Sequence, residues 1–437
     1  MNRNINIGVV CLARKTYDFE AAREIYATAR AALSALPDVT WSFVEELVIE
    51  PDEARAAADL LSQKHLDGLV VITGTFHLGH LALILKKRLD IPALLWGFSE
   101  LPYNGGKIRL NSVCGLNLNA SNLYKAGYDD VCCHLGDEID ADWLAAVRMK
   151  SVLVHAHVGL LGYRADGFFN LDIDEMQTYR QTGILIDHYE LAEVTGESAD
   201  ETETQAFLSE IDGCFACGGV TDKQRVLVAE LCVKFEKFMK KYKLDAVAVR
   251  CWPEFANFYG CAPCAAMSIL QSRGVLLGCE GDLEGVISML VTASLQEGAP
   301  FLADLSQVFD DETALLWHCG VAPADLWDGR SARSLDTYFA GGRGVTAGFV
   351  LKSGPLSILR VDSARGKTRL FYQEGDAVPM EKLLTGTYAK VRFRRPSSDL
   401  LDLVTSSGVA HHLALVYTQR GRAFRLFARM MGYEVIE

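Results

Sequence analysis

Residues 66–97, LDGLVVITGTFHLGHLALILKKRLDIPALLWG, hold two apolar runs separated by an amphipathic segment. The runs LDGLVVITG and IPALLWG are short and apolar, as buried strands are, and residues 78–89 between them have helical spacing. The residues before them repeat this alternation of strand-like and helix-like segments, at 5–12, 18–35, 40–47 and 51–64. The resulting βαβαβαβ order predicts a doubly wound, mainly parallel sheet. No GxGxxG follows the first strand, so a dinucleotide is not the indicated ligand.

The full length of 437 residues predicts more than one domain. A second α/β segment begins near Lys150 with SVLVHAHVGLLGY, and short alternating runs separated by Gly, Pro and Ser begin near Phe349. We therefore expect two N-terminal doubly wound α/β domains followed by a small C-terminal β-barrel domain. The expected domains comprise residues 1–149, 150–345 and 346–437.

Composition and charge exclude several classes of protein. The net charge of −13 argues against a nucleic-acid partner, which usually needs a basic face. No apolar stretch reaches the roughly 18 residues of a membrane span, and the N-terminus lacks the features of a secretory signal. We expect a cytoplasmic protein whose twelve cysteines are mostly reduced core thiols.

Acidic residues lie between two apolar runs in GCEGDLEG, residues 278–285. Asp282 is placed to cap the helix that follows, and Glu284 lies favourably in its first turn. Glu280 is not explained in this way. It lies at the carboxyl end of a predicted strand, where open α/β sheets bind their ligands.

Further candidate ligands interrupt apolar runs downstream. Asp304 breaks one strand-like run and His318 closes another, although each is also compatible with a hydrogen-bonded core residue. His411 and His412 are adjacent at the front of a predicted strand, and we expect only one of them to face a shared centre. Carboxylates and imidazoles suit a divalent cation in mixed O/N coordination, Mn²⁺ best and Mg²⁺ or Co²⁺ less well.

Two CxxC pairs offer a competing metal site. Cys214 and Cys217 form one pair, and Cys261 and Cys264 form the other, which is spacing compatible with structural zinc. The gap between the pairs is wider than in common zinc ribbons, and CAPCAAMSIL also reads as the start of a packed helix. A zinc protein therefore stays an alternative.

Several blocks together resemble the L-fucose isomerase and L-arabinose isomerase superfamily of metal-dependent aldose–ketose isomerases. The resemblance covers most of the chain and its blocks occur in the family's order. They are HVGLLGYRADGF, RCWPEF, CAPCAAMSIL, CEGDLEGVISML, FLADLSQ, LLWHCG and GVAHHLALVY.

The resemblance implies manganese bound by Glu280, Asp304 and His412. His318 resembles a further ligand of the arabinose-type enzymes, so it binds either the metal or the substrate. We expect the substrate-binding residues to be Trp252, Glu254, His318, His411, His77 and His80. The resemblance also implies a homo-oligomer, a trimer or hexamer, in which a neighbour's N-terminal domain closes the pocket.

The implied reaction interconverts an aldose and its ketose through a cis-enediolate, with Glu280 and Asp304 as the catalytic acid/base pair. The motifs are compatible with a deoxyhexose, a pentose or an anionic sugar such as a sulfonated hexose. A non-catalytic cytoplasmic sugar-binding protein is the alternative, because the N-terminal α/β repeat also resembles sugar-binding modules.

Overall fold

The computed structural model describes residues 4–339 and 342–437, and the chain divides into two compact units. The first unit runs to Ser151 and also includes Arg422–Gly432, while the second comprises Val152–Gly421 and Tyr433–Glu437. The expected boundary at 149/150 thus lies beside this division. Within the described residues, no helix is both long and apolar enough to span a membrane.

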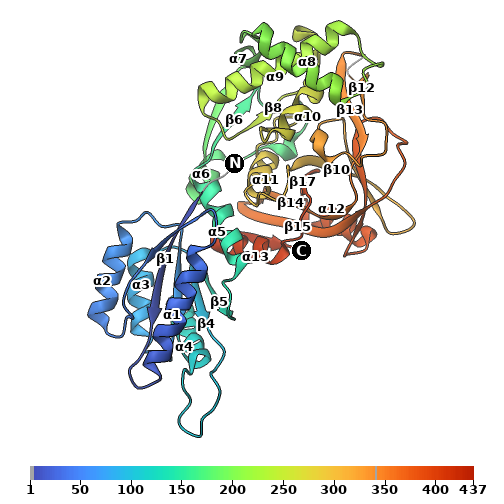
Figure 1. Ribbon diagram of the computed structural model, residues 1–437. Helices are drawn as coiled ribbons and strands as arrows, with labels where there is room; N and C mark the ends of the chain where they lie inside the picture. The colour runs from blue at the N-terminus through green and yellow to red at the C-terminus, as the bar shows by residue number, and fades with distance from the viewer. Residues whose placement is uncertain (1–3, 340–341) are drawn as a thin grey trace. The chain divides into compact units, whose positions relative to one another are not determined.

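The first unit is a parallel sheet with helices on both sides (Figure 1). Its elements are β1 (Ile5–Leu12), α1 (Phe19–Ser34), β2 (Val39–Phe43), α2 (Pro51–Ser62), β3 (Gly68–Thr73), α3 (His80–Leu89), β4 (Ala93–Gly97), α4 (Ser112–Lys125), β5 (Val131–Leu135), α5 (Ala141–Val154), which continues into the second unit, and α13 (Gly421–Met431).

The five strands of this sheet lie in the order β2-β1-β3-β4-β5. This is a doubly wound order, as the sequence predicts for residues 5–97. The central strands β3 and β4 are buried along their whole length, which explains why their sequences are continuous apolar runs rather than alternating ones. Helix α1 begins where predicted, because Asp18 accepts a hydrogen bond from the Ala21 N–H.

A helix from the far end of the sequence completes the first unit. Arg422, at the start of α13, forms a two-pronged ion pair with Asp140, with both N–O distances 2.5 Å. The Asp140 side chain is almost fully buried. Burial alone would raise the pKa of Asp140, but the hydrogen bonds from Arg422 and the Trp143 N–H lower it.

The second unit combines a smaller parallel sheet with a larger mixed sheet. Its elements are β6 (His157–Leu161), η1 (Phe169–Leu171), α6 (Glu175–Thr182), β7 (Leu185–Tyr189), α7 (Ala192–Thr195), α8 (Glu201–Cys214), α9 (Asp222–Tyr242), β8 (Ala246–Val249), η2 (Phe255–Tyr259), α10 (Cys264–Ser272), β9 (Leu276–Gly278), α11 (Leu283–Ala293), β10 (Phe301–Val308), β11 (Ala314–His318), η3 (Ala324–Leu326), β12 (Ser334–Phe339), β13 (Gly344–Val350), β14 (Gly354–Ala364), β15 (Lys367–Val378), β16 (Thr387–Phe393), α12 (Ser397–Ser407), β17 (His412–Val416) and β18 (Glu434–Ile436).

The parallel sheet has the order β7-β6-β8-β9. Helix α11 follows β9 in the chain and is buried over nearly its whole length. It packs against β14 and β17 of the mixed sheet and against β8 and β9 of the parallel sheet. Figure 1 shows α11 at the centre of this unit. The helix therefore joins the parallel sheet to the mixed sheet.

Six strands of the mixed sheet pair in a closed ring, in the order β11-β10-β17-β14-β15-β16 and back to β11. The ring differs from the predicted β-barrel of residues 346–437, because β10 and β11 enter it from before residue 346. The predicted boundary at 345/346 falls inside β13, which pairs with β16. Backbone pairing between distant strands is not encoded in the local alternation on which the boundary was based.

The contact between α13 and the first unit can be tested by Arg422→Ala. The change leaves the buried Asp140 carboxylate without its ionic partner, and we expect the first unit to lose about 1–3 kcal/mol of unfolding free energy. Urea unfolding measures this loss.

The matched control is Arg88→Ala. Arg88 pairs with Asp59 at 2.9 Å, but both side chains are more than half exposed. Its loss should cost no more than ~1 kcal/mol. Equal unfolding midpoints for the two variants would contradict a structural role of the Arg422–Asp140 pair.

Candidate functional site

The site begins in the tight turn between β9 and α11. Glu280 has φ +63°, a left-handed conformation that costs a non-glycine residue about 1–3 kcal/mol and is concentrated at functional sites. Gly281 follows with φ +73°, and a Cβ there would lie 2.4 Å from the Tyr163 carbonyl oxygen. The Ala165 N–H donates to the Glu280 carbonyl at 2.9 Å. The turn is therefore fixed by the chain segment that follows β6.

The structure brings together the three side chains predicted as metal ligands. Glu280 Oε2 lies 3.3 Å from His412 Nε2, and Asp304 Oδ1 lies 3.8 Å from the same nitrogen. Asp304 on β10 is directly opposite His412 on β17 in the antiparallel register. Opposite residues of such a pair project their side chains to the same face of the sheet.

Asp282 determines which nitrogen of His412 faces the two carboxylates. Its Oδ2 lies 2.9 Å from His412 Nδ1, so Nδ1–H donates to Asp282 and Nε2 is left to face Glu280 and Asp304. Burial alone would lower the pKa of His412, but the hydrogen bonds to Asp282 and Glu280 outweigh it and raise the pKa. The pocket therefore favours a positive charge at Nε2, supplied either by a proton or by a cation.

A buried arginine holds Asp282 in turn. Arg360 of β14 is completely buried, and its Nη1 and Nη2 donate to the two Asp282 oxygens at 2.7 and 3.1 Å. Burial alone would raise the pKa of Asp282, but Arg360 and His412 keep it well below its usual range. Arg360 Nη1 also donates to the His412 carbonyl at 2.9 Å. One guanidinium thus fixes both the carboxylate and the backbone of the histidine.

Asp282 and Glu284 show that the N-terminus of α11 was correctly predicted. Asp282 Oδ1 accepts from the Gly285 N–H at 2.9 Å, and Glu284 lies in the first turn. Both acids were predicted to act only at the start of the helix, and Arg360 was not predicted. The one available signal was a lone arginine inside the apolar run LSIL-R-V of a predicted strand.

Glu280 is ionised in this environment. Burial alone would raise its pKa, but hydrogen bonding to His411 and His412 lowers it to about 2. Trp252 Nε1 donates to the other oxygen, Oε1, at 3.2 Å. The predicted pocket-wall residue Trp252 therefore touches the predicted catalytic acid.

The two adjacent histidines do not face opposite ways. Both His411 Nε2, at 3.7 Å, and His412 Nε2 approach Glu280 Oε2, and the two ring centroids are 4.3 Å apart. The expectation of opposite faces was wrong because β17 begins at His412. His411 precedes the strand, so the alternation of strand side chains does not apply to it.

His411 sits among residues that the sequence did not indicate. The Asn170 amide nitrogen lies 3.1 Å from His411 Nδ1, and the Phe168 ring packs edge-on against both His411 and Trp252. Phe168 thus packs against the two residues, Trp252 and His411, that approach the Glu280 carboxylate. Both newly found residues come from the HVGLLGYRADGF region and its continuation, whose role was visible only as a resemblance.

His318 is buried beside the same centre, with its two ring nitrogens in different surroundings. Nδ1 accepts the Cys319 N–H at 2.8 Å, so a neutral ring carries its hydrogen on Nε2. Potential ligand atoms of His318, Asp304 and His412 lie within 4.8 Å of one another. An Nε2–H donor is suited to a substrate oxygen rather than to a cation.

The remaining predicted substrate-binding residues are Glu254, His77 and His80. Glu254 is held by Arg250 through both of its oxygens, at 2.9 and 2.7 Å. His77 and His80 belong to the first unit. His77 is buried with Nδ1 3.0 Å from the Thr75 carbonyl oxygen and Nε2 2.8 Å from the Asn119 amide nitrogen, so both ring nitrogens are used there. His80 is exposed at the start of α3.

The donor set fits a divalent cation of the manganese type. Glu280 and Asp304 offer carboxylate oxygens and His412 offers an imidazole nitrogen, which are the ligands such ions prefer. Within the described residues, Asp304 Oδ1 and His318 Nε2 are buried atoms without a hydrogen-bond partner, and both face this centre. Two carboxylates that approach one imidazole nitrogen repel each other unless a positive charge lies between them.

The CxxC pairs do not form the alternative zinc site. Across residues 4–339 and 342–437, groups of three or more potential ligands within 4.8 Å include none of Cys214, Cys217, Cys261 and Cys264. The second pair instead opens α10, which is buried throughout, as the packed-helix interpretation predicts.

Comparisons with known proteins point to one family. Residues 8–136 match the family described as fucose/sulfoquinovose isomerase, N-terminal domain. A sulfoquinovose isomerase of Priestia megaterium is 27% identical over 444 residues, with 99% of each chain covered. One from Alkalicoccus urumqiensis is 25% identical over 407 residues, with 90% of each covered.

A solved structure was also found. It is an ABC transporter solute-binding protein from Agrobacterium vitis bound with alpha-D-tagatopyranose, 13% identical, covering 68% of this chain and 90% of its own. The TM-score of 0.18 is too low for the likeness to carry an argument.

Asp282→Asn tests the link between Asp282 and His412. Asparagine retains a capping oxygen for α11 but holds the His412 ring less firmly, and we expect Mn²⁺ affinity to fall about 10–100-fold. Titration of metal-free protein with Mn²⁺, followed by the EPR signal of the free ion, measures the change.

Asp200→Asn is the matched control, because Asp200 caps α8 in the same way but touches no residue of the site. It should bind Mn²⁺ like the unchanged chain. A folded Asp282→Asn protein with unchanged Mn²⁺ affinity would show that Asp282 does not position a metal ligand.

Proposed function

We propose that this chain is an isomerase of the fucose isomerase-like superfamily that interconverts a sulfonated aldohexose and its ketose with the help of a bound divalent metal ion. One observation carries the metal-dependent part of this proposal. It is the approach of Glu280 Oε2 and Asp304 Oδ1 to the same nitrogen, His412 Nε2, together with the buried Arg360–Asp282 ion pair that holds the histidine.

The metal would be held by Glu280, Asp304 and His412, with Mn²⁺ as the first candidate and Mg²⁺ or Co²⁺ as alternatives. When bound, such an ion polarises a carbonyl and stabilises negative charge on neighbouring sugar oxygens. The donor set supports this assignment, since it contains no thiolate and combines two carboxylates with one imidazole.

Proton transfer is assigned to the two carboxylates. Isomerisation moves a proton between C1 and C2 of the sugar and a second proton between the two attached oxygens, through a cis-enediolate. Glu280 is ionised at neutral pH and so can accept a carbon-bound proton. Asp304 flanks the same centre and can transfer the proton between the two sugar oxygens. The reverse assignment of the two acids is equally compatible. Positioned acid/base groups of this kind contribute about 10²–10⁴ in rate.

The surrounding residues orient the sugar and the acids. His318 Nε2–H is a buried donor for a substrate oxygen. Trp252 fixes one oxygen of Glu280, and His411 contributes a partly exposed ring beside it. These contacts leave the Glu280 carboxylate little freedom to rotate, which preserves its geometry between the two proton transfers.

A sulfonated hexose is proposed as substrate because the relatives that match nearly the whole chain are named sulfoquinovose isomerases. Of the sugars compatible with the sequence motifs, this is the anionic one. The identity of about a quarter supports the class of sugar, and the substrate assay below decides between it and neutral hexoses or pentoses.

The homo-oligomer expected from the resemblance, a trimer or hexamer in the cytoplasm, is part of the proposal. A neighbour's N-terminal domain would then contribute to closing the pocket. His80 has an exposed ring available for such a contact, whereas both ring nitrogens of His77 are occupied within its own domain.

Glu280→Gln tests the catalytic assignment. Glutamine has the same shape but cannot accept the carbon-bound proton, so we expect turnover to fall at least about 10²-fold while the fold is retained. Ketose formation measures turnover, and circular dichroism checks the fold.

The paired control is Glu254→Gln, whose carboxylate is held by Arg250 and lies outside the cluster of carboxylates. We expect a smaller loss than for Glu280→Gln. Near-normal turnover of Glu280→Gln would overturn its assignment as a catalytic residue.

Substrate and metal dependence are tested together. Metal-free protein is assayed with sulfoquinovose, its neutral 6-deoxy analogue, L-fucose and L-arabinose, with and without Mn²⁺. We expect ketose only when Mn²⁺ is added, and a kcat/KM at least tenfold higher for the sulfonated sugar.

Two outcomes of this assay oppose the proposal. Sugar binding without ketose formation under any metal condition would favour the non-catalytic sugar-binding protein. Turnover that is unaffected by removing the metal would contradict the role assigned to Glu280, Asp304 and His412.

A further inference from the structure

Four buried thiols gather on the inner side of the same site. Cys251 follows β8, Cys264 opens α10, Cys279 follows β9 and Cys319 follows β11. None of the four is more than 8% exposed. Four segments that are distant in sequence thus deliver cysteines to one location, although the sequence suggested only scattered core thiols.

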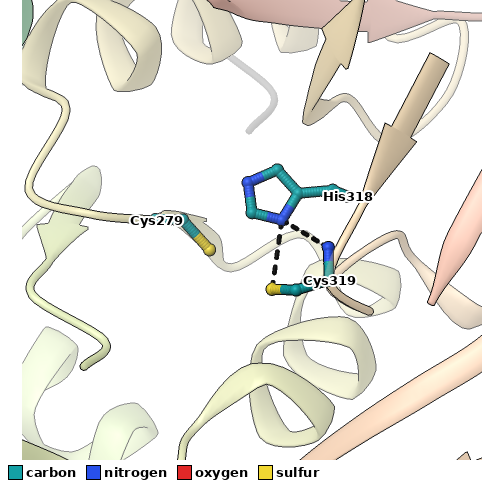
Figure 2. A group of neighbouring side chains, drawn as sticks. All are labelled: Cys279, His318 and Cys319. Carbon is teal, nitrogen blue, oxygen red and sulfur yellow. Dashed lines mark hydrogen bonds between the residues drawn. The ribbon is translucent and has the colours of Figure 1, made fainter. Parts of the chain in front are cut away.

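Two of the thiols, together with His318, are close enough to share one ion. The sulfurs of Cys279 and Cys319 and a ring nitrogen of His318 lie within 4.8 Å of one another. Cys264 Sγ lies 3.7 Å from Cys319 Sγ, and Cys251 interacts with Cys279. Figure 2 shows the Cys279 and Cys319 sulfurs on the same side of the His318 ring. We call Cys251, Cys264, Cys279 and Cys319 the thiol cluster.

The distance between the Cys264 and Cys319 sulfurs matches that between neighbouring thiolates of a metal site. Zinc lies about 2.3 Å from each thiolate in a tetrahedral site, which places neighbouring sulfurs about 3.8 Å apart. The Cys264–Cys319 separation of 3.7 Å is close to this value. A disulfide needs its sulfurs at about 2.05 Å, so the two cysteines would have to move considerably to form one.

We propose that the thiol cluster is a binding site for a thiophilic cation such as Zn²⁺. Cys279, Cys319 and His318 Nδ1 are the ligands, and Cys264, whose sulfur lies 3.7 Å from Cys319 Sγ, is the nearest candidate for a fourth. Each ligating thiol releases its proton to solvent as the sulfur–metal bond forms, and no oxidant or reductant is involved. Soft thiolates select such ions over manganese, which prefers oxygen and imidazole donors.

The two sites are adjacent but use different donors. Cys279 immediately precedes Glu280, and Cys319 immediately follows His318. His318 lies between them, with Nδ1 3.2 Å from Cys319 Sγ and Nε2 near Asp304 and His412. The inference about the cluster does not depend on the proposed isomerase activity, because its thiols are not residues of the catalytic centre and its test measures sulfur ligation.

The test uses Cd²⁺ as the probe, because its thiolate complexes absorb in the ultraviolet. In the background protein, the more accessible cysteines Cys114, Cys133, Cys214 and Cys217 are replaced by serine. The reduced, metal-free protein is then titrated with Cd²⁺ in the presence of saturating Mn²⁺. We expect thiolate-to-cadmium absorption that saturates at one Cd²⁺ per chain.

Cysteine variants then identify the residues that bind the ion. In the same background, Cys279→Ala and Cys319→Ala should each weaken Cd²⁺ binding at least tenfold. Cys11→Ala removes a thiol that is equally buried in the first unit and should leave binding unchanged. The ¹¹³Cd NMR shift of the unsubstituted chain reports sulfur ligation without any substitution, so the test survives a variant that fails to fold.

Three results would overturn the proposal. They are the absence of thiolate absorption in the background protein, absorption that persists unchanged in both cluster variants, and a Cys264–Cys319 disulfide in protein purified under reducing conditions. Because the readout is spectroscopic, a negative result leaves the Mn²⁺-dependent isomerase assay unaffected.

Discussion

The buried contact of Arg360 with Asp282, and of Asp282 with His412, holds the candidate site together. The three residues come from β14, the N-cap of α11 and β17, and at most 1% of each is exposed. Two charges removed from water are costly unless they are paired and fully hydrogen-bonded, and Asp282 meets this condition by accepting from Arg360, His412 and the Gly285 N–H. Removing any partner would leave a charge or a dipole unpaired in the core.

This contact determines the chemistry on the far side of His412. With Nδ1 bonded to Asp282, Nε2 faces Glu280 and Asp304, which arrive from the parallel sheet and from the strand ring respectively. A site built at the junction of two sheets can bring together carboxylates that no single element could place side by side. The left-handed turn at Glu280 is stabilised by the same junction.

Most of the local secondary structure could be predicted from the sequence. The alternating apolar runs predicted the first sheet, the short alternating runs beyond Phe349 predicted strands there, and the acid before VISML predicted the helix cap. The pairing of strands that are distant in sequence could not be predicted. Nothing local says that β10 and β11 close a ring with strands beyond residue 354, or that the chain returns to the first unit at Arg422.

The candidate site also combines local features that the sequence indicates with long-range contacts that it does not. Glu280 was singled out because its position had no structural explanation. Asp304 and the histidine pair were grouped with it as candidate ligands of one cation, and the family resemblance selected His412 from the pair. Asp282 was predicted only as a helix cap, so its contact with His412 was not predicted. One carboxylate can accept hydrogen bonds from a backbone N–H and a histidine at once. Arg360 and the thiol cluster were missed because their partners are distant in sequence.

Anomalous diffraction from crystals of the protein grown with Mn²⁺ tests the central claim most directly. A manganese peak bonded to Glu280, Asp304 and His412 Nε2, with His412 Nδ1 still on Asp282, is the predicted result. A peak bonded elsewhere, or none at this centre at saturating Mn²⁺, would contradict the account.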